Sequence, residues 1–214
     1  MYLIMMSVCL FPFNRTSLRN KFDLARRTIS LCVLASLREN DFGFQNNLKS
    51  NQKNCIKFLS FPACIVSTGT RGIIKELIKK KLFDIVITTC GTLDHDLARL
   101  WEDYYHGHFM ADDKKLYKQG INRLGNIFIP NKCYGDILEE RIQPILSEIY
   151  KKNNKRSTKD LIWEFAKHLE KEKNKEESII YWAYKNCIPI YVPGITDGAF
   201  GSQIWMYYQT HRDF

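Results

Sequence analysis

The sequence predicts an α/β fold in which helices flank a mainly parallel sheet. Two short apolar runs, 56–61 and 83–89, have the length and the residue types of buried strands. Between them, residues 71–82 place isoleucine and leucine at helical spacing and lysine on the outside. A strand, a helix and a strand in this order form a βαβ unit, whose two strands are parallel. A further strand is expected at 188–192.

The other elements are expected to be mainly helical. Apolar periodicity predicts helices at 16–38, 91–101, 135–151, 158–171, 177–186 and 198–208, and a short strand at 127–129. Ser157 or Thr158 is expected to cap the helix that starts at that point. Residues 39–54 are polar and are expected to form a loop. Helices that alternate with buried strands are typical of an α/β domain.

Composition narrows the class of protein. The 214 residues are 45% hydrophobic and carry a net charge of +9, which suits a globular domain and, in principle, an acidic partner or nucleic acid. The lysines, however, cluster at 79–81, 151–155 and 167–175, as they do on solvated helix ends and faces. No arginine-rich block is interleaved with aromatic residues, so no nucleic-acid partner is expected.

The cysteines indicate a reducing compartment. There are seven of them, an odd number, and no two form a C-x-x-C pair, which argues against a disulfide scaffold and for a cytoplasmic protein. His106 and His108 lack a second ligand pair nearby, so no metal site is expected there. The first 13 residues, MYLIMMSVCLFPF, are too few to span a bilayer and lack a basic leader. They are expected to form a buried segment or a poorly fitting start, with no membrane association.

Three loops are candidates for a binding site. They are 62–69, 89–96 and 196–201, and each follows a predicted strand, holds a glycine and precedes a predicted helix. In open parallel sheets, ligands bind beyond the carboxyl ends of the strands, and helix N-termini suit a pyrophosphate. Asp197 could accept hydrogen bonds from ribose hydroxyls. The same residues also suit helix starts that are merely capped, and neither GxGxxG nor GxxxxGK[ST] is present to decide.

Other polar residues in these regions have two interpretations each. Asp94 and Asp96 could hold a cation, or could belong to a capped helix start. His95, between them, is either an acid/base or a surface histidine. Asn122 and Arg123 lie between glycines before a strand, which favours a fixed loop, either structural or at an interface.

Four segments in order carry a resemblance to a known family. They are FLSFPACIVSTGTRGII, DIVITTCGTLDHDLAR, GINRLGNIFIPN and SIIYWAYKNCIPIYVPGITDGAFG. Together they resemble the deoxyhypusine synthase family, especially its archaeal members, from about Cys55 to the end. Upstream, GFQ at 43–45 resembles a further family element. The resemblance implies two parts: an N-terminal helical extension over 1–40, which matches poorly, and a partial NAD-binding domain over 41–214.

The resemblance also implies a fold and a reaction. The fold would be a Rossmann-like parallel sheet with flanking helices, here an incomplete doubly wound domain. NAD would take a hydride from spermidine, and the aminobutyl group would pass through an enzyme lysine to one lysine of the translation initiation factor 5A precursor. The enzyme would be a tetramer with active sites at subunit interfaces.

Residue roles follow from the same resemblance. Carried over position by position, the NAD-binding residues would be Ala63, Cys64, Ile65, Val66, Ser67, Thr89, Cys90, Gly91 and Asp197. Many relatives have Ser-Asn where this chain has Ala63-Cys64. The family's acidic pair falls on Asp94 and His95, which would bind spermidine, and a further family acid falls on Ser202.

The nucleophilic lysine of the family lies in a Trp-Gly-Lys segment that these 214 residues do not contain. No catalytic residue is therefore expected in this chain, which would be a truncated synthase. An alternative is a non-catalytic paralogue that acts as a partner or regulatory subunit of a complete, homo- or heterotetrameric synthase. A third possibility is an NAD-binding oxidoreductase unrelated to polyamines.

Overall fold

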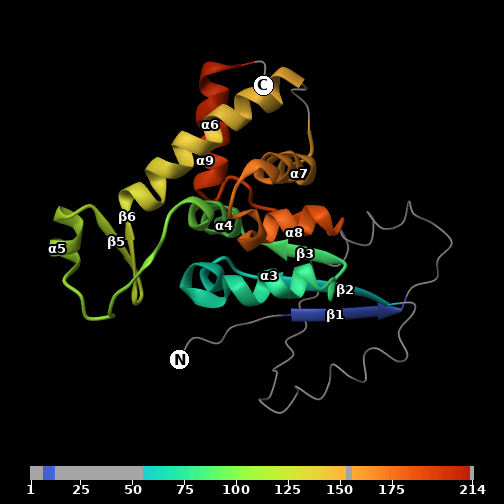
Figure 1. Ribbon diagram of the computed structural model, residues 1–214, viewed down its shortest axis with the longest axis horizontal. Coiled ribbons are helices and arrows are strands. Elements are labelled where there is room, and N and C mark those ends of the chain that lie inside the picture. The colour runs from blue at the N-terminus through green and yellow to red at the C-terminus, as the bar shows by residue number, and fades with distance from the viewer. Residues whose placement is uncertain (1–6, 13–54, 153–155, 213–214) are drawn as a thin grey trace, which may run out of the picture.

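The computed structural model describes residues 7–12, 55–152 and 156–212. In these ranges the main sheet has four strands in the order β1-β2-β3-β7 (Figure 1). The strands are β1 (Ser7–Pro12), β2 (Cys55–Phe61), β3 (Ile85–Thr88) and β7 (Ile190–Tyr191). β2, β3 and β7 are parallel, and β1 is antiparallel to β2 at the edge. The predicted mainly parallel sheet is therefore confirmed, and the first residues add an edge strand that the sequence did not predict.

Six α-helices of the described part flank this sheet or pack beyond it. They are α3 (Arg71–Lys79), α4 (Gly91–Trp101), α6 (Gly135–Lys152), α7 (Thr158–His168), α8 (Ile179–Lys185) and α9 (Ala199–Thr210). Short helical turns precede α3 and α6, and two more lie between α7 and α8: η2 (Val66–Thr70), η3 (Asn131–Cys133), η4 (Leu169–Lys171) and η5 (Lys175–Glu177). All six helices start within two residues of the predicted positions. The predicted helix at 16–38 and the GFQ element lie outside the described residues.

The strand register explains which side of the sheet is buried. Val86 and Thr88 of β3 are buried, whereas their neighbours along the strand are only half-buried. Leu59 pairs with Val86, and Phe61 pairs with Thr88. Since side chains paired across a parallel ladder share a face, these four form one buried surface of the sheet. Buried and half-buried side chains alternate along β3, as expected when helices pack closely on one face of the sheet.

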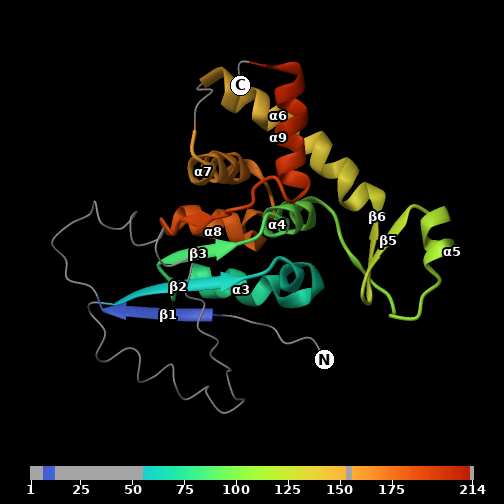
Figure 2. The same ribbon diagram turned by 180° about the vertical axis from the view of Figure 1, so that it is seen from behind.

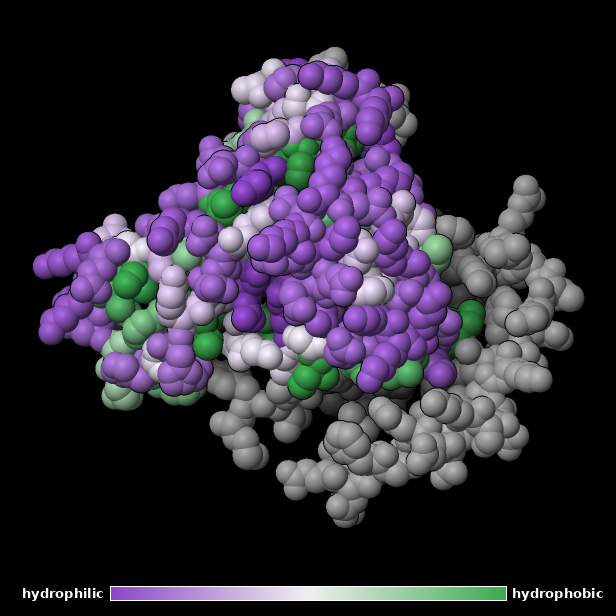
Figure 3. Space-filling view, in the orientation of Figure 1, coloured by the Kyte–Doolittle hydropathy of each residue, from purple (hydrophilic) through white to green (hydrophobic). Residues whose placement is uncertain are grey.

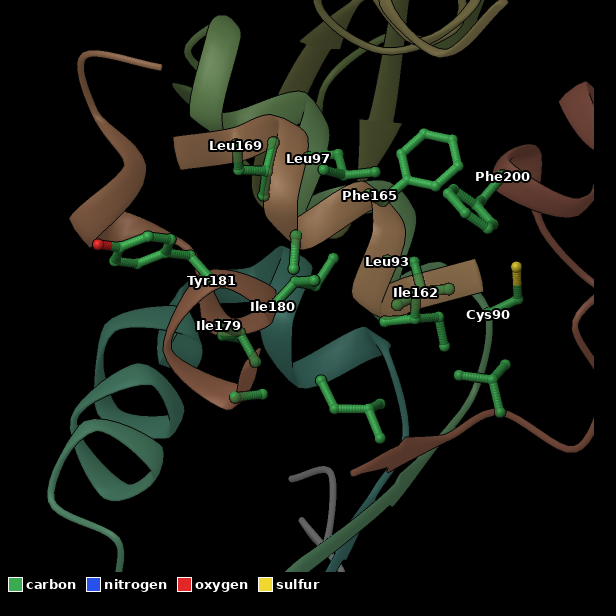
Figure 4. Close-up of a cluster of buried hydrophobic side chains, with 14 of the residues drawn as sticks. Cys90, Leu93, Leu97, Ile162, Phe165, Leu169, Ile179, Ile180, Tyr181 and Phe200 are labelled. Atoms are coloured by element: carbon green, nitrogen blue, oxygen red, sulfur yellow. The ribbon is translucent and has the colours of Figure 1, made fainter. Parts of the chain in front are cut away.

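α4 is the centre of the helical layer. It contacts α6, α8 and α9, and a helix with neighbours on several sides buries most of its circumference. Figure 4 shows Leu93 and Leu97 of α4 close to Phe165 of α7 and Phe200 of α9. The two phenylalanine rings lie edge to face with centroids 4.8 Å apart, a favourable aromatic geometry. The core thus forms around the helix that begins at the second candidate loop.

Serine side chains cap the starts of α7 and α8. The Ser157 hydroxyl accepts a hydrogen bond from the N–H of Asp160 at 3.1 Å, so the predicted cap of α7 is confirmed. Ser178 caps α8 in the same way, through the N–H of Tyr181 at 3.1 Å.

A small arm projects from the main body (Figures 1 and 2). It consists of β4 (Tyr105–His106), α5 (Asp113–Lys118), β5 (Ile121–Leu124) and β6 (Ile127–Pro130), with strand order β4-β6-β5. Large apolar side chains are exposed on it: Tyr105, Phe109, Met110, Tyr117 and Leu124. Figure 3 shows apolar surface over this arm beside mainly hydrophilic surface on the body.

The prediction of a loop at Asn122 and Arg123 was wrong, because both lie in β5. The Asn122 amide donates hydrogen bonds to the Ile129 carbonyl at 3.3 Å and to Asn131 Oδ1 at 2.8 Å. The Arg123 guanidinium donates to both carboxylate oxygens of Asp113, at 2.6 and 2.8 Å. These hydrogen bonds explain why residues 122 and 123 are polar although they lie in a strand. In the ranges that the structure describes, no helix is long and apolar enough to cross a membrane.

Candidate functional site

Two of the candidate loops meet at the carboxyl edge of the sheet. The loop after β2 and the loop after β3 are neighbours because their strands are adjacent and parallel. The N–H of Ala63 donates a hydrogen bond to Thr89 Oγ1 at 2.9 Å. A Cβ on Gly91 would lie 2.9 Å from the Cβ of Ala63, which is closer than carbon atoms pack. Glycine at 91 therefore allows the first turn of α4 to approach the first loop.

The third loop, after β7, meets the second in the same way. A Cβ on Gly198 would lie 2.5 Å from Asp94 Oδ2 and 2.9 Å from Cys90 Sγ. Only glycine permits this approach of the chain before α9 to the start of α4. The predicted site residues 63–67, 89–91 and 197 thus come from three loops that lie side by side at one edge. Their role toward a cofactor stays a prediction.

Exposure separates the residues of this edge into two groups. Cys64, Thr89 and Asp197 are exposed and Ala63 is half-buried, whereas Ile65, Val66, Ser67 and Cys90 are buried. The Ser67 hydroxyl donates to the Cys64 carbonyl at 2.8 Å. The buried residues can therefore meet a ligand only through their backbone, and the exposed ones also through their side chains.

The Cys90 thiol is not a nucleophile at neutral pH. Burial, followed by the nearby Asp94 carboxylate, raises the pKa of Cys90 to about 12. Because the thiolate is the reactive form, a protonated buried thiol is inert. Cys90 therefore contributes packing against Gly198 rather than chemistry.

Asp94 is buried at this edge, with 1% of its surface exposed. Its carboxylate accepts hydrogen bonds from the N–H groups of Ala199 and Phe200, at 2.9 and 2.7 Å. The Tyr134 hydroxyl donates to Oδ2 at 2.9 Å, and the Cys90 thiol lies 3.8 Å from Oδ1. Burial raises the pKa of Asp94, and the hydrogen bonds oppose this shift. The carboxylate that was expected to bind spermidine is therefore the N-terminal cap of α9.

His95 lies beside this carboxylate and is neutral at physiological pH. Its Nδ1 hydrogen-bonds the Tyr104 hydroxyl at 2.8 Å, and its ring is 5.2 Å from the Tyr134 ring, centroid to centroid. Burial, followed by the positive charge of Arg99, lowers the pKa of His95 to about 4. A neutral imidazole between two tyrosines can accept or donate a hydrogen bond, but it does not attract a polyamine by charge.

Asp96 is fully buried and faces the other side of α4. Its carboxylate accepts from Arg71 Nε at 2.8 Å, from the Ser178 hydroxyl at 2.7 Å and from the N–H groups of Ile179 and Ile180, both at 3.0 Å. Residues two apart on a helix point about 200° apart. The interpretation of Asp94 and Asp96 as a cation site was therefore wrong, because each caps a different helix.

Sequence reasoning missed several residues of this edge. Tyr104 and Tyr134 carried no recognisable signal, because a single aromatic residue near the end of a helix is common. The Thr88 hydroxyl donates to the Phe61 carbonyl at 2.8 Å and lies 2.6 Å from the Thr92 hydroxyl. It links β2, β3 and α4. The prediction that Asp94 and His95 contact spermidine stays a prediction, and the structure gives both side chains other partners.

Comparison with known proteins identifies the family. The family model described as deoxyhypusine synthase matches residues 7–214. Relatives named "Probable deoxyhypusine synthase" from Picrophilus torridus and Thermoplasma acidophilum are 57% and 53% identical over 157 residues. A third, from Sulfolobus acidocaldarius, is 43% identical over 152 residues.

A crystal structure of a proposed deoxyhypusine synthase from Entamoeba histolytica has the same fold, with a TM-score of 0.54 at 21% identity over 71% of this chain and 45% of that one. The alignments with the Picrophilus and Thermoplasma relatives cover 73% of this chain and 49% of each relative. The chain thus spans about half the length of the curated relatives it matches. On the match of the family model and the identity to these relatives, the chain belongs to the deoxyhypusine synthase family.

Proposed function

We propose that this chain is the NAD-binding part of a deoxyhypusine synthase, a transferase. The reaction would move the aminobutyl group of spermidine to one lysine of the translation initiation factor 5A precursor. The observation that carries the proposal is the meeting of three loops at the carboxyl edge of the parallel sheet, the position where such sheets bind nucleotides. Family membership supports the reaction class, and the arrangement of the three loops supports a cofactor site at this edge.

The groups at this edge fit a dinucleotide. The start of α4 presents the positive end of the helix dipole, which suits a pyrophosphate, while the N–H groups of Thr92 and Leu93 already donate to the Thr89 and Cys90 carbonyls. At the start of α9, the N–H groups of Ala199 and Phe200 donate to Asp94. The exposed carboxylate of Asp197 would accept hydrogen bonds from ribose hydroxyls. When bound here, NAD would supply the hydride acceptor for oxidation of an amine.

The remaining parts of the proposal concern substrate and assembly. Asp94 and His95 remain the proposed neighbours of spermidine: His95 would act as a neutral hydrogen-bonding group, and the enclosed carboxylate of Asp94 would not touch the polyamine. The ammonium groups of spermidine would also need carboxylates outside the described residues. We propose a cytoplasmic tetramer with the active site at a subunit interface, where a second chain could supply such groups. The N-terminal part up to residue 40 and the domain from 41 onward stay proposed divisions.

NAD binding to the purified chain tests the proposal directly. Isothermal titration should detect NAD binding by the wild-type protein. Asp197→Asn should weaken it roughly tenfold to a hundredfold, because it removes charge-assisted hydrogen bonds to the ribose. Lys118→Gln, on α5 and outside the three loops, is the matched control and should bind as the wild type does. A folded chain that binds no NAD would refute the proposal.

A second candidate function is that of a partner or regulatory subunit. It is favoured by the large apolar side chains that the arm exposes, a kind of surface that is typical of protein–protein contacts. This candidate predicts that the chain copurifies with a full-length synthase and changes its activity. Deoxyhypusine formation by the purified chain alone, from spermidine and the factor precursor, would contradict it.

A further inference from the structure

One carboxylate joins two walls of the proposed cofactor site. Asp94 belongs to the first turn of α4, just after the turn formed by residues 89–91. Its two oxygens accept the first two N–H groups of α9, which begins immediately after Asp197 and Gly198. The segment that carries Asp197 is thereby fixed at its C-terminal end to the helix that starts at the second loop.

The contact is close and leaves no room for a ligand at the carboxylate. The backbone at Gly198 approaches Asp94 Oδ2 and Cys90 Sγ so closely that a Cβ would meet both, at 2.5 and 2.9 Å. Oδ2 also accepts the Tyr134 hydroxyl at 2.9 Å. With 1% of the residue exposed, an ammonium group could reach the carboxylate only if α9 moved away.

Such a movement would be costly. It would leave the N–H groups of Ala199 and Phe200 without their acceptor in a buried position, and buried donors without partners are strongly unfavourable. The second acidic residue of α4 offers a comparison, because Asp96 caps α8 with the same chemistry on another side of α4. Two similar carboxylates on one helix thus hold two different elements, and only one of these elements borders the proposed site.

We propose that Asp94 is a positioning residue. Its carboxylate holds the N-terminus of α9 against α4, keeps the turn at residues 194–198 beside the turn at residues 89–91, and so sets the affinity for the dinucleotide through Asp197. This inference rests on the proposed function, and it replaces direct contact between Asp94 and the polyamine by a role in the cofactor site.

The test compares Asp94→Asn with wild type by two independent measurements. The amide keeps the size of the side chain but presents N–H groups to the donors of Ala199 and Phe200. Hydrogen exchange should therefore increase at residues 194–201, and NAD should bind roughly tenfold more weakly, as expected for the loss of about one strong hydrogen bond. The affinity for spermidine, measured separately, should not change.

Two further variants keep the test decisive. Tyr134→Phe removes only one donor to Asp94 and should loosen residues 194–201 in the same direction by less, which covers the case in which Asp94→Asn does not fold. Ser178→Ala is the matched control, since it removes a hydrogen bond to Asp96 at the start of α8. It should increase exchange around residues 179–181 and leave both residues 194–201 and NAD affinity as in the wild type.

The outcomes separate this inference from the proposed function. If Asp94→Asn or Tyr134→Phe leaves exchange at residues 194–201 unchanged, the inference is overturned. It is also overturned if Asp94→Asn binds NAD normally but loses spermidine affinity, which would mean direct contact with the polyamine. If wild type binds no NAD, the proposed function fails, and the exchange measurement still decides whether Asp94 holds the α9 turn.

Discussion

His95 shows how its surroundings set the protonation state of a side chain. An exposed histidine has a pKa near 6.5, but burial and the charge of Arg99 lower the pKa of His95 to about 4. Between these values the unfolded chain binds a proton that the folded chain does not. The stability of the fold therefore rises with pH across this window and falls as the solution is acidified.

His95→Gln should remove this pH dependence. Between about pH 5 and about pH 7.5, the free energy of unfolding of the wild type should rise by about 2 kcal/mol more than that of the variant. Urea denaturation at both pH values measures the difference, and the carboxylates common to both proteins cancel. Equal changes in the two proteins would show that His95 is not buried in the neutral form.

Asp94 and Asp96 of α4 show that residue type alone does not identify the role of an acidic side chain. The acidic side chains at 94 and 96 were compatible with a cation site, with a substrate site and with helix caps. The structure makes both of them caps, because the partners are backbone N–H groups at the starts of α9 and α8. Those partners lie more than eighty residues away along the chain, so no local pattern could have identified them.

At the scale of elements, the βαβ unit was predictable, and in the arm the strand predicted at 127–129 is confirmed as β6, whereas the other elements of the arm were not predicted. Strands at 56–61 and 83–89 with a helix between them carry strong periodic signals. β4 and α5 are too short to show a period, and β1 is an apolar run that fits several structures. The turn Gly125-Asn126 between β5 and β6 did carry a signal, because Gly-Asn between two short apolar runs is typical of a β-hairpin.

This hairpin turn can be tested with a pair of glycine substitutions. Gly125 has φ +64°, which disfavours any side chain, and a Cβ there would lie 3.2 Å from Phe109 Cε1. Gly125→Ala should lower the free energy of unfolding by about 1 kcal/mol. The control is Gly72→Ala in α3, where no atom lies within 4 Å of the added Cβ.

Gly72→Ala should stabilise the protein by roughly 0.5 to 1 kcal/mol, because alanine favours the helix. Thermal unfolding of both variants and the wild type shows whether each substitution raises or lowers the stability. A stabilised Gly125→Ala would mean that residue 125 does not adopt the left-handed conformation in solution.

At the scale of the whole molecule, the main sheet of the described ranges runs from the antiparallel strand β1 to β7. Within the described ranges, β7 pairs with β3 and has no strand on its other side. An open edge of this kind accepts further strands or needs cover, and the curated relatives are about twice as long as the matched region. The incomplete doubly wound domain stays a prediction.

The central claim is that three loops at one sheet edge form a single NAD site. Hydrogen exchange of the purified chain with and without NAD tests it most directly, because it locates the ligand on the chain. The account predicts that NAD slows exchange together at residues 63–67, 89–91 and 194–198, and leaves the arm at residues 105–130 unchanged. Protection confined to the arm, or to one loop alone, would contradict it.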